Sequence, residues 1–201
     1  MQQSAALDYN TNLDDARELA ELMYNLARLK VPTLAVVQGA AFGGALGLIS
    51  CCDMAIGASD AQLCLSEVRI GLAPAVISPF VVQAMGERAA RRYALTAERF
   101  SGDRARELGL LAEAYPAAEL EQQVGIWIDN LLLNSPQAMR ASKELLREVG
   151  HGELTPAIRR YCENAIARIR VSPEGQEGLR AFLEKRSPAW QSEPSNKEPR
   201  P

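Results

Sequence analysis

Hydrophobic and polar positions along this chain first follow a mixed pattern and then a purely helical one. Leucine and methionine recur at helical spacing from Leu19 to Leu29, after an N-cap signal at Asn12, and Pro32 ends that helix. Four apolar runs are short enough to be strands: 33–37, 54–57, 62–65 and 110–115. Helical patterns separate the first run from the second and the third run from the fourth. This part of the chain therefore predicts strand–helix units.

After Pro116 only helical patterns occur. Proline, or Ser or Thr next to proline, opens the long segments 117–133, 136–149 and 155–170, and a last segment spans 173–185. The tail from Ser187 is polar and proline-rich, which predicts disorder. We therefore expect an α/β core over 1–115, a helical region over 116–186 and a disordered tail over 187–201.

Composition and charge exclude several classes of function. The chain has 201 residues, of which 47% are hydrophobic and 23% charged, and these values are typical of a globular protein. The net charge of −3 gives no reason to expect nucleic acid as a partner. No apolar run has the length of a membrane span, and the N-terminus lacks the basic and apolar regions of an export signal. We expect a cytoplasmic protein with no membrane partner.

The four cysteines, Cys51, Cys52, Cys64 and Cys162, and the single His151 form no metal-binding pattern. Their spacing also gives no cysteine–histidine pair for catalysis. We interpret the cysteines as reduced thiols in the core, and we expect no metal.

A glycine-rich turn is the first candidate for chemistry. It leads from the strand 33–37 through Gly39, Gly43 and Gly44 into a helix that spans 44–52. Glycine lets a ligand approach the backbone closely, and the first turn of a helix presents N–H groups that have no partner within the helix. Such a turn can hold an anion or a developing oxyanion. Close packing of a buried helix on a sheet would require the same glycines, and at this point both interpretations stay open.

Several sequence blocks, found in one order, extend the argument beyond this turn. They are QGAAFGGALGL, CCDMAIG, AQLCLSEVRIGLAP, ALTAERFSGDRARELGLLAEAYP, NSPQAMRASKELL and GLRAFLEKRSPAW. Together they resemble the crotonase (enoyl-CoA hydratase/isomerase) superfamily, from around Asp14 to Trp190. The resemblance implies a spiral of ββα turns with a C-terminal helical trimerisation region, assembly as homotrimers or dimers of trimers, and acyl-CoA thioesters as substrates. It implies no separate cofactor, because CoA is part of the substrate.

The resemblance also assigns site residues. The N–H of Gly44, beside Gly43, matches the family's oxyanion donor to the thioester, and Glu67 in LSEVRIG matches a catalytic glutamate. The position of the family's other catalytic glutamate holds Gly47, which shares a helix face with Gly44. Glu67 would then be the single acid/base, and the alternative is a surface glutamate that pairs with Arg69.

One carboxylate leaves three chemistries open. Glu67 could move a proton between two carbons of one substrate, as a Δ3,Δ2-enoyl-CoA isomerase does, or it could activate water, as a hydratase does. In the third, the space left by the missing side chain at Gly47 would admit a bulkier or carboxylated branch of the substrate. A crotonase-fold protein that only binds or oligomerises is the non-enzymatic alternative.

The segment from Pro74 to Pro79 favours a branched substrate. Together with Gly47, it is similar to bacterial hydratases of leucine/isovalerate and acyclic terpene catabolism, which act on 3-methylglutaconyl-CoA or isohexenylglutaconyl (γ-carboxygeranoyl)-CoA. Both substrates carry a carboxylate on the branch at the β-carbon. Arg69 is a candidate to bind that carboxylate, although alternation along a strand would equally let it form an internal salt bridge. We expect Pro74 to contact the substrate.

Two further expectations come from the resemblance. Phe182 and Lys185 match an aromatic–lysine pair that binds CoA, often the CoA of a neighbouring subunit. The family's first strands, adenine-binding loop and first oxyanion N–H have no counterpart after Met1. The chain is therefore expected to be truncated at its N-terminus, to bind acyl-CoA weakly and to turn over slowly.

Overall fold

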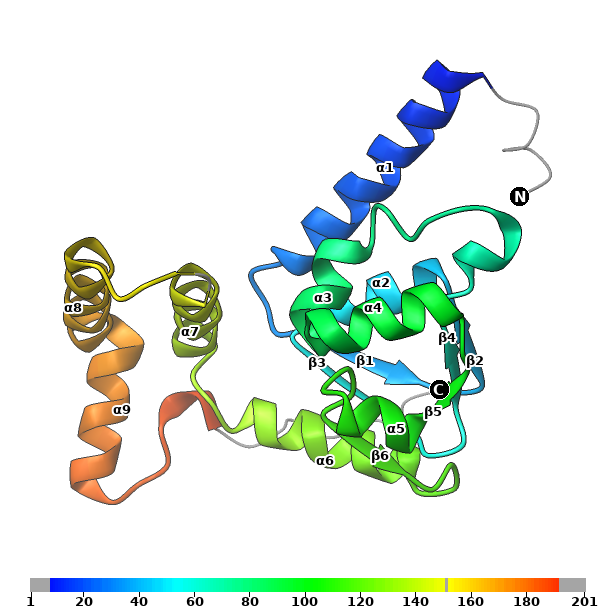
Figure 1. Cartoon of the computed structure of the whole chain (residues 1–201). Helices are drawn as coiled ribbons and strands as arrows, with labels where there is room; N and C mark the ends of the chain where they lie inside the picture. Colours follow the sequence, from blue (N-terminus) through cyan, green and yellow to red (C-terminus); the bar gives the residue numbers. More distant parts are fainter. Residues whose placement is uncertain (1–7, 151, 192–201) are drawn as a thin grey trace. The chain divides into compact units, whose positions relative to one another are not determined.

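The computed structural model describes residues 8–150 and 152–191, which belong to two compact units (Figure 1). The first unit contains the residues up to Leu29 together with 33–124, and the second contains 30–32 together with the residues from Gly125 onward. Helix α6 (Leu120–Leu132) spans this division. The division between the two units therefore falls within α6.

Two small three-stranded sheets form the centre of the first unit. In one sheet, β1 (Leu34–Val37) pairs in parallel with β3 (Met54–Ala58), and β3 pairs in parallel with β6 (Glu113–Tyr115). Val36 lies opposite Ile56, whose side chain is fully buried. Three of the four apolar runs predicted as strands form this sheet, and β3, which lies between the other two strands, is buried along most of its length, as an apolar run predicts.

The second sheet contains two strands that the sequence did not predict. Here β2 (Ala40–Phe42) pairs in parallel with β4 (Gln62–Cys64), and β4 pairs antiparallel with β5 (Phe100–Ser101). The strands β2 and β5 are three and two residues long, too short to show an alternating pattern. Phe42 lies opposite Cys64, so β2 and β4 end at the same edge of the sheet.

The helices of the first unit lie before β1 and between the strands, where helical patterns were predicted. They are α1 (Tyr9–Ala27), α2 (Gly44–Cys51), α3 (Ser78–Met85), α4 (Glu87–Thr96) and α5 (Gly102–Glu107), with a 3-10 turn η2 (Glu67–Ile70). The N-cap expected at Asn12 is wrong, because α1 begins earlier, where Asp8 accepts a 2.9 Å hydrogen bond from the Thr11 N–H. Aspartate caps a helix as well as asparagine does, and exposed polar residues can continue it.

The core of the first unit is apolar and draws on most of these elements. The largest side chains that are less than 2% exposed are Met23, Leu46, Ile56, Leu63, Leu65, Leu111 and Leu120. Met23 is the buried residue of α1, whereas Leu22 on the same helix is 53% exposed. Through Met23, α1 packs against α2, the helix that follows the glycine turn.

The helices α7 (Pro136–Val149), α8 (Pro156–Val171) and α9 (Pro173–Glu184) follow one another in the second unit. Each has proline in its first turn, after a Ser or Thr whose hydroxyl accepts a hydrogen bond from a backbone N–H: Ser135, Thr155 and Ser172. The predicted helix starts are confirmed, because proline needs no hydrogen-bond partner there and these hydroxyls cap the helix.

Part of the segment predicted to be a disordered tail is ordered in the second unit. Ala189–Gln191 form a 3-10 turn, η3, and the indole N–H of Trp190 donates a 3.2 Å hydrogen bond to the carbonyl of Leu133. A Cβ on Gly178 would stand 2.9 Å from the Trp190 ring, so α9 and this ring are in close contact. The expectation of disorder is wrong for this turn, and residues 192–201 lie outside the described part of the chain.

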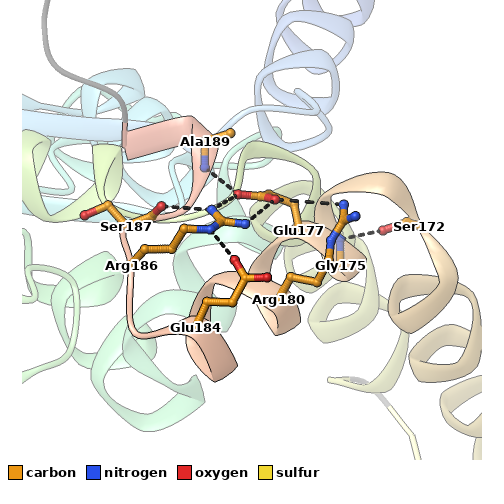
Figure 2. Close-up of polar contacts among 8 residues, drawn as sticks. All are labelled: Ser172, Gly175, Glu177, Arg180, Glu184, Arg186, Ser187 and Ala189. Carbon is orange, nitrogen blue, oxygen red and sulfur yellow. Dashed lines mark hydrogen bonds and ion pairs between the residues drawn. The ribbon is translucent and has the colours of Figure 1, made fainter.

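Glu177 on α9 holds the chain just before this turn (Figure 2). Its carboxylate accepts hydrogen bonds of 2.6 and 3.1 Å from the Arg186 guanidinium and of 2.9 Å from the Ala189 N–H. The bond from Arg186, and next the one from Ala189, lower the pKa of Glu177 to about 2. These contacts join residues too far apart in sequence for a local pattern to reveal them.

Candidate active site

The glycine turn expected to bind an anion lies between β2 and α2. Gly43 has φ 55° and ψ −121°, a conformation that other residues rarely adopt, and it caps α2. Its N–H donates a 2.9 Å hydrogen bond to the Cys64 carbonyl, which ties the turn to the end of β4. Gly44 is the first residue of α2, so its N–H has no acceptor within the helix. A Cβ on Gly44 would meet nothing within 4 Å, so the space beside this residue is open.

Glu67 lies against the same turn. It opens η2, which follows β4 after Leu65 and Ser66. Because β2 and β4 are parallel, the segments that follow them emerge at one edge of the sheet. A Cβ on Gly43 would stand 3.1 Å from Glu67 Oε1 and 3.9 Å from Ser66 Oγ. The glycine therefore leaves room for the carboxylate.

One oxygen of this carboxylate is buried without a partner. No group in the described part of the chain donates a hydrogen bond to Glu67 Oε2, which is shielded from solvent. Buried oxygen atoms almost always have a partner, so an exception calls for an explanation such as strain, a catalytic role or a bound water. The side chain as a whole is half-buried, so it is still accessible to a bound molecule.

Gly47, the other position expected to face the site, is packed by the protein itself. A Cβ here would overlap the Cγ2 methyl of Ile77 and lie 2.8 Å from Ile77 Cβ and 2.9 Å from Met23 Cε. Ile77 is 3% exposed, and Met23 is fully buried. The expectation that Gly47 leaves room for a substrate branch is wrong, because Ile77 and Met23 fill that room. Gly47 is also buried, and its contact with a substrate stays a prediction.

Arg69 is directed at a backbone carbonyl. It lies on the 3-10 turn η2 and not on the expected strand, and its Nη2 donates a 2.8 Å hydrogen bond to the Ala97 carbonyl. The ion pairs of the described residues include neither a pair with Glu67 nor an internal salt bridge of Arg69. Binding of a substrate carboxylate by Arg69 stays a prediction, and the guanidinium already has an acceptor.

A cavity of about 190 Å³ is bordered by α3 and α4. Pro74, the predicted substrate contact, lines it together with Ile77 and Val81, and the ion pair of Glu87 with Arg91 also borders it. The lining is mostly apolar and suits a hydrocarbon group. Ile77 lines this cavity and also covers Gly47, so one side chain borders the cavity and the site.

The cysteines are free thiols, of which Cys51 and Cys64 are buried and Cys52 and Cys162 half-buried. Burial, and to a smaller extent the neighbouring Cys52, raises the pKa of Cys51 to about 11. Within the described residues, no three His, Cys, Asp or Glu side chains gather to hold a metal ion. The helices in that part of the chain are also too short or too polar to cross a membrane.

Comparison with known proteins decides the family. The model of the enoyl-CoA hydratase/isomerase family matches residues 1–193. The chain belongs to this family. The crotonase-superfamily resemblance inferred from the sequence blocks is thereby confirmed.

Solved structures of similar proteins confirm the α/β crotonase fold. An enoyl-CoA hydratase from Shewanella pealeana is 53% identical with a TM-score of 0.90, covering 94% of this chain and 71% of that one. Pseudomonas aeruginosa AtuE is 37% identical with a TM-score of 0.86, covering 94% and 72%. The hydroxycinnamoyl-CoA hydratase-lyase of Pseudomonas fluorescens is 32% identical over 177 residues, which are 85% of this chain and 63% of that protein. The chain thus spans between 63% and 72% of the length of these relatives.

The predicted CoA contacts of this family member, Phe182 and Lys185, lie at the end of α9 in the second unit. Phe182 is 81% exposed, so it is not a core residue among the described residues of its unit. Lys185 is exposed, caps α9 with φ 54°, and donates a 3.3 Å backbone hydrogen bond to the Phe182 carbonyl. Both side chains are accessible to a molecule outside this unit, and their role toward CoA stays a prediction.

Ile77 is the residue beside the site that the sequence did not reveal. It lies in the proline-broken stretch 70–79. Its apolar side chain between Pro74 and Pro79 was the one available signal of burial. Nothing local to the chain connects this position with Gly47, because the contact exists only after α2 and α3 have packed together.

Proposed function

We propose that this member of the enoyl-CoA hydratase/isomerase family adds water to the double bond of an α,β-unsaturated acyl-CoA. The observation that carries the proposal is the Glu67 carboxylate, which lies against the Gly43 turn with one buried oxygen that has no partner among the described residues. The N–H of Gly44 begins the adjacent helix, where the helix dipole and the unpaired N–H favour negative charge. Hydration of an α,β-unsaturated thioester requires an acid/base group beside an oxyanion donor.

In the proposed mechanism, Glu67 carries both proton transfers. It accepts a proton from water as the water oxygen bonds to the β-carbon, and the π electrons of the double bond move toward the thioester oxygen. The Gly44 N–H stabilises the resulting enolate oxyanion. The protonated Glu67 then gives its proton to the α-carbon, which restores the thioester. Position 47 is a glycine, and Ile77 and Met23 fill the space beside it. The mechanism therefore uses no second carboxylate at this position.

Δ3,Δ2-enoyl-CoA isomerisation is the second candidate function. The apolar packing of Ile77 and Met23 against Gly47 favours it, because one carboxylate that moves a proton between the α- and γ-carbons needs no water. The Gly44 N–H would stabilise the same enolate in this reaction. The two candidates differ in whether a hydroxyl group is added, and product analysis distinguishes them.

For the substrate, we propose an acyl-CoA with a β-carboxymethyl group, either 3-methylglutaconyl-CoA or isohexenylglutaconyl-CoA, in leucine/isovalerate or acyclic terpene catabolism. The similarity of the segment 74–79 to the hydratases of these pathways supports it. The apolar cavity lined by Pro74 and Ile77 gives an isohexenyl chain a surface of suitable character. Arg69 and the position of Gly47 add no support, because the first donates to Ala97 and the second is filled.

The test is an absorbance assay of the α,β-unsaturated thioester with 3-methylglutaconyl-CoA, its isohexenyl homologue and a straight-chain 3-enoyl-CoA. Glu67→Gln is expected to lower the rate by about 10²- to 10⁴-fold. Glu121→Gln, at an exposed carboxylate of α6, is the matched control and keeps the rate. Full activity of Glu67→Gln contradicts the assigned acid/base. Conversion of the 3-enoyl-CoA alone favours the isomerase, and no conversion by the wild type favours a non-catalytic binding protein.

We also propose that the protein assembles as a homotrimer or a dimer of trimers in which Phe182 and Lys185 contact the CoA of a neighbouring copy. Support comes from Phe182 and Leu183, which are 81% and 77% exposed, a high exposure for large apolar side chains on one helix. Analytical ultracentrifugation measures the assembly. Phe182→Ala is expected to raise the KM for acyl-CoA, whereas Leu95→Ala, at an exposed residue of α4, leaves it unchanged. A monomer in solution contradicts the proposal.

A further inference from the structure

The turn that carries Glu67 is a short 3-10 helix. Within and around η2, the Arg69 N–H donates to Ser66 at 3.1 Å and the Gly71 N–H to Val68 at 3.3 Å, and the Leu72 N–H closes the turn at 3.1 Å onto Glu67. Hydrogen bonds of 3-10 helices have poor geometry, which limits these helices to a few residues. Catalysis requires a side chain to be held within about 0.5 Å of its productive position. The turn therefore needs support from outside.

The Glu67 side chain has no such support of its own. No donor among the described residues reaches its Oε2, and its Oε1 faces the place where Gly43 has no side chain. The carboxylate is therefore positioned by the backbone of η2. Whatever fixes η2 also fixes the distance between Glu67 and the N–H of Gly44.

Two hydrogen bonds tie the chain on either side of Glu67 to one carbonyl oxygen. The Arg69 Nη2 donates to Ala97 O at 2.8 Å, and the Cys64 Sγ donates to the same oxygen at 3.3 Å. Cys64 ends β4 before Glu67, and Arg69 follows Glu67 within η2. A guanidinium is a stronger donor than a thiol, so Arg69 makes the main connection.

The oxygen that receives both bonds is itself held firmly. Ala97 is fully buried and ends α4 in the left-handed conformation, with φ 49° and ψ 32°. A residue with a Cβ adopts this conformation only where its surroundings impose it. The Ala97 N–H donates to the Tyr93 carbonyl at 3.0 Å, and the next residue, Glu98, pairs with Arg92 at 2.7 Å. The last carbonyls of a helix receive no hydrogen bond from an N–H within the helix. The Ala97 carbonyl can therefore accept one from Arg69.

We propose that Arg69 is a positioning residue for Glu67, which it serves by fixing η2 to the Ala97 carbonyl. The inference rests on the proposed role of Glu67 as acid/base. Without the guanidinium, η2 shifts and the carboxylate loses its place relative to the Gly44 N–H, while binding of the thioester is unaffected. Arg69 then acts through Glu67 on every substrate, whether or not the substrate carries a branch carboxylate.

The kinetic test compares Arg69→Met and Arg69→Lys with Arg88→Met, which removes an exposed arginine of α4. Each protein is assayed with 3-methylglutaconyl-CoA and with crotonyl-CoA, which has no branch carboxylate. Arg69→Met is expected to lower kcat for both thioesters by about 10- to 100-fold and to change KM less than about twofold. Arg69→Lys recovers part of kcat, because an ammonium group can still donate to Ala97. A rise in KM confined to the carboxylated thioester overturns the proposal in favour of a substrate contact.

Hydrogen exchange gives a readout that needs no substrate. Mass spectrometry of the segment 66–72 is expected to show amide exchange about tenfold faster in Arg69→Met than in the wild type, and unchanged in Arg88→Met. Unchanged exchange in Arg69→Met overturns the inference. If the wild type converts neither thioester, the proposed function fails, and the exchange result still decides whether Arg69 holds the turn. If Arg69→Met does not fold, the same comparison is made with Arg69→Lys.

Discussion

Ile77 occupies the space into which a side chain at Gly47 would extend. A Cβ on Gly47 would overlap the Cγ2 methyl of Ile77 and lie 2.8 Å from its Cβ, and both residues are buried. Protein interiors are packed as densely as organic crystals, so the glycine and the isoleucine depend on each other. The position at which the family resemblance would place a second glutamate is therefore closed by an apolar side chain, and Glu67 remains the carboxylate beside the glycine turn.

Gly47→Ala is expected to destabilise the protein by about 1–3 kcal/mol, because Ile77 and Met23 have to move to admit the methyl group. In an Ile77→Ala background, the same substitution is expected to cost less, since the overlapping methyl is gone. Urea unfolding of the four proteins of this cycle measures the coupling. Gly125→Ala is the control, because an added Cβ on α6 meets nothing within 4 Å and is expected to stabilise by about 0.5–1 kcal/mol. Equal costs in both backgrounds contradict the packing argument.

Gly43→Ala and Gly39→Ala form a matched pair that separates backbone strain from displacement of Glu67. Both glycines have positive φ, 55° and 65°, so each substitution is expected to cost about 1–2 kcal/mol of stability. Only a Cβ at Gly43 comes within 3.1 Å of Glu67 Oε1, whereas one at Gly39 meets nothing within 4 Å. Gly43→Ala alone is therefore expected to lower kcat, by about tenfold or more. Equal losses of kcat in the two variants would show that the contact with Glu67 is unimportant.

Cys51 is expected to be the least reactive of the cysteines. Its pKa of about 11 leaves roughly one thiol in a thousand ionised at about pH 8, and the side chain is buried. With a coloured disulfide reagent, the half-buried Cys52 and Cys162 should react first, and all four should react after unfolding in urea. Peptide mapping after partial labelling identifies the modified residues. Early labelling of Cys51 is the result that this argument does not allow.

The contact of Trp190 with α9 is expected to weaken in acid. The bonds from Arg186 and Ala189 lower the pKa of Glu177 from 4.5 to about 2, so their stabilising effect is complete above about pH 4.5 and is lost as the pH falls toward about 2. Trp190 fluorescence, measured in a Trp127→Phe background, should shift toward that of an exposed indole over this range. Glu177→Gln should show the exposed spectrum even at neutral pH. A Trp190 spectrum that stays constant down to pH 2 contradicts the proposed link.

The helices and most strands could be predicted because their signals are local. The proline that opens α7, α8 and α9 and the hydroxyl that precedes it are neighbours in sequence, and so are the apolar residues of β1 and β3. The errors fall where local signals are weak or equivalent. Asp8 and Asn12 can both cap a helix, β2 and β5 are too short to show a period, and η3 is ordered by contacts with Glu177 and Leu133.

By itself, the sequence determined the order of elements, the glycine turn, the candidate carboxylate Glu67 and the absence of a glutamate at position 47. These properties reside in residue identity and in spacings of a few residues. Only the tertiary structure decided that Ile77 and Met23 close the space at Gly47 and that Arg69 donates to Ala97. Each of these contacts joins segments that are far apart in the chain, and dense packing specifies such contacts only once the segments lie together.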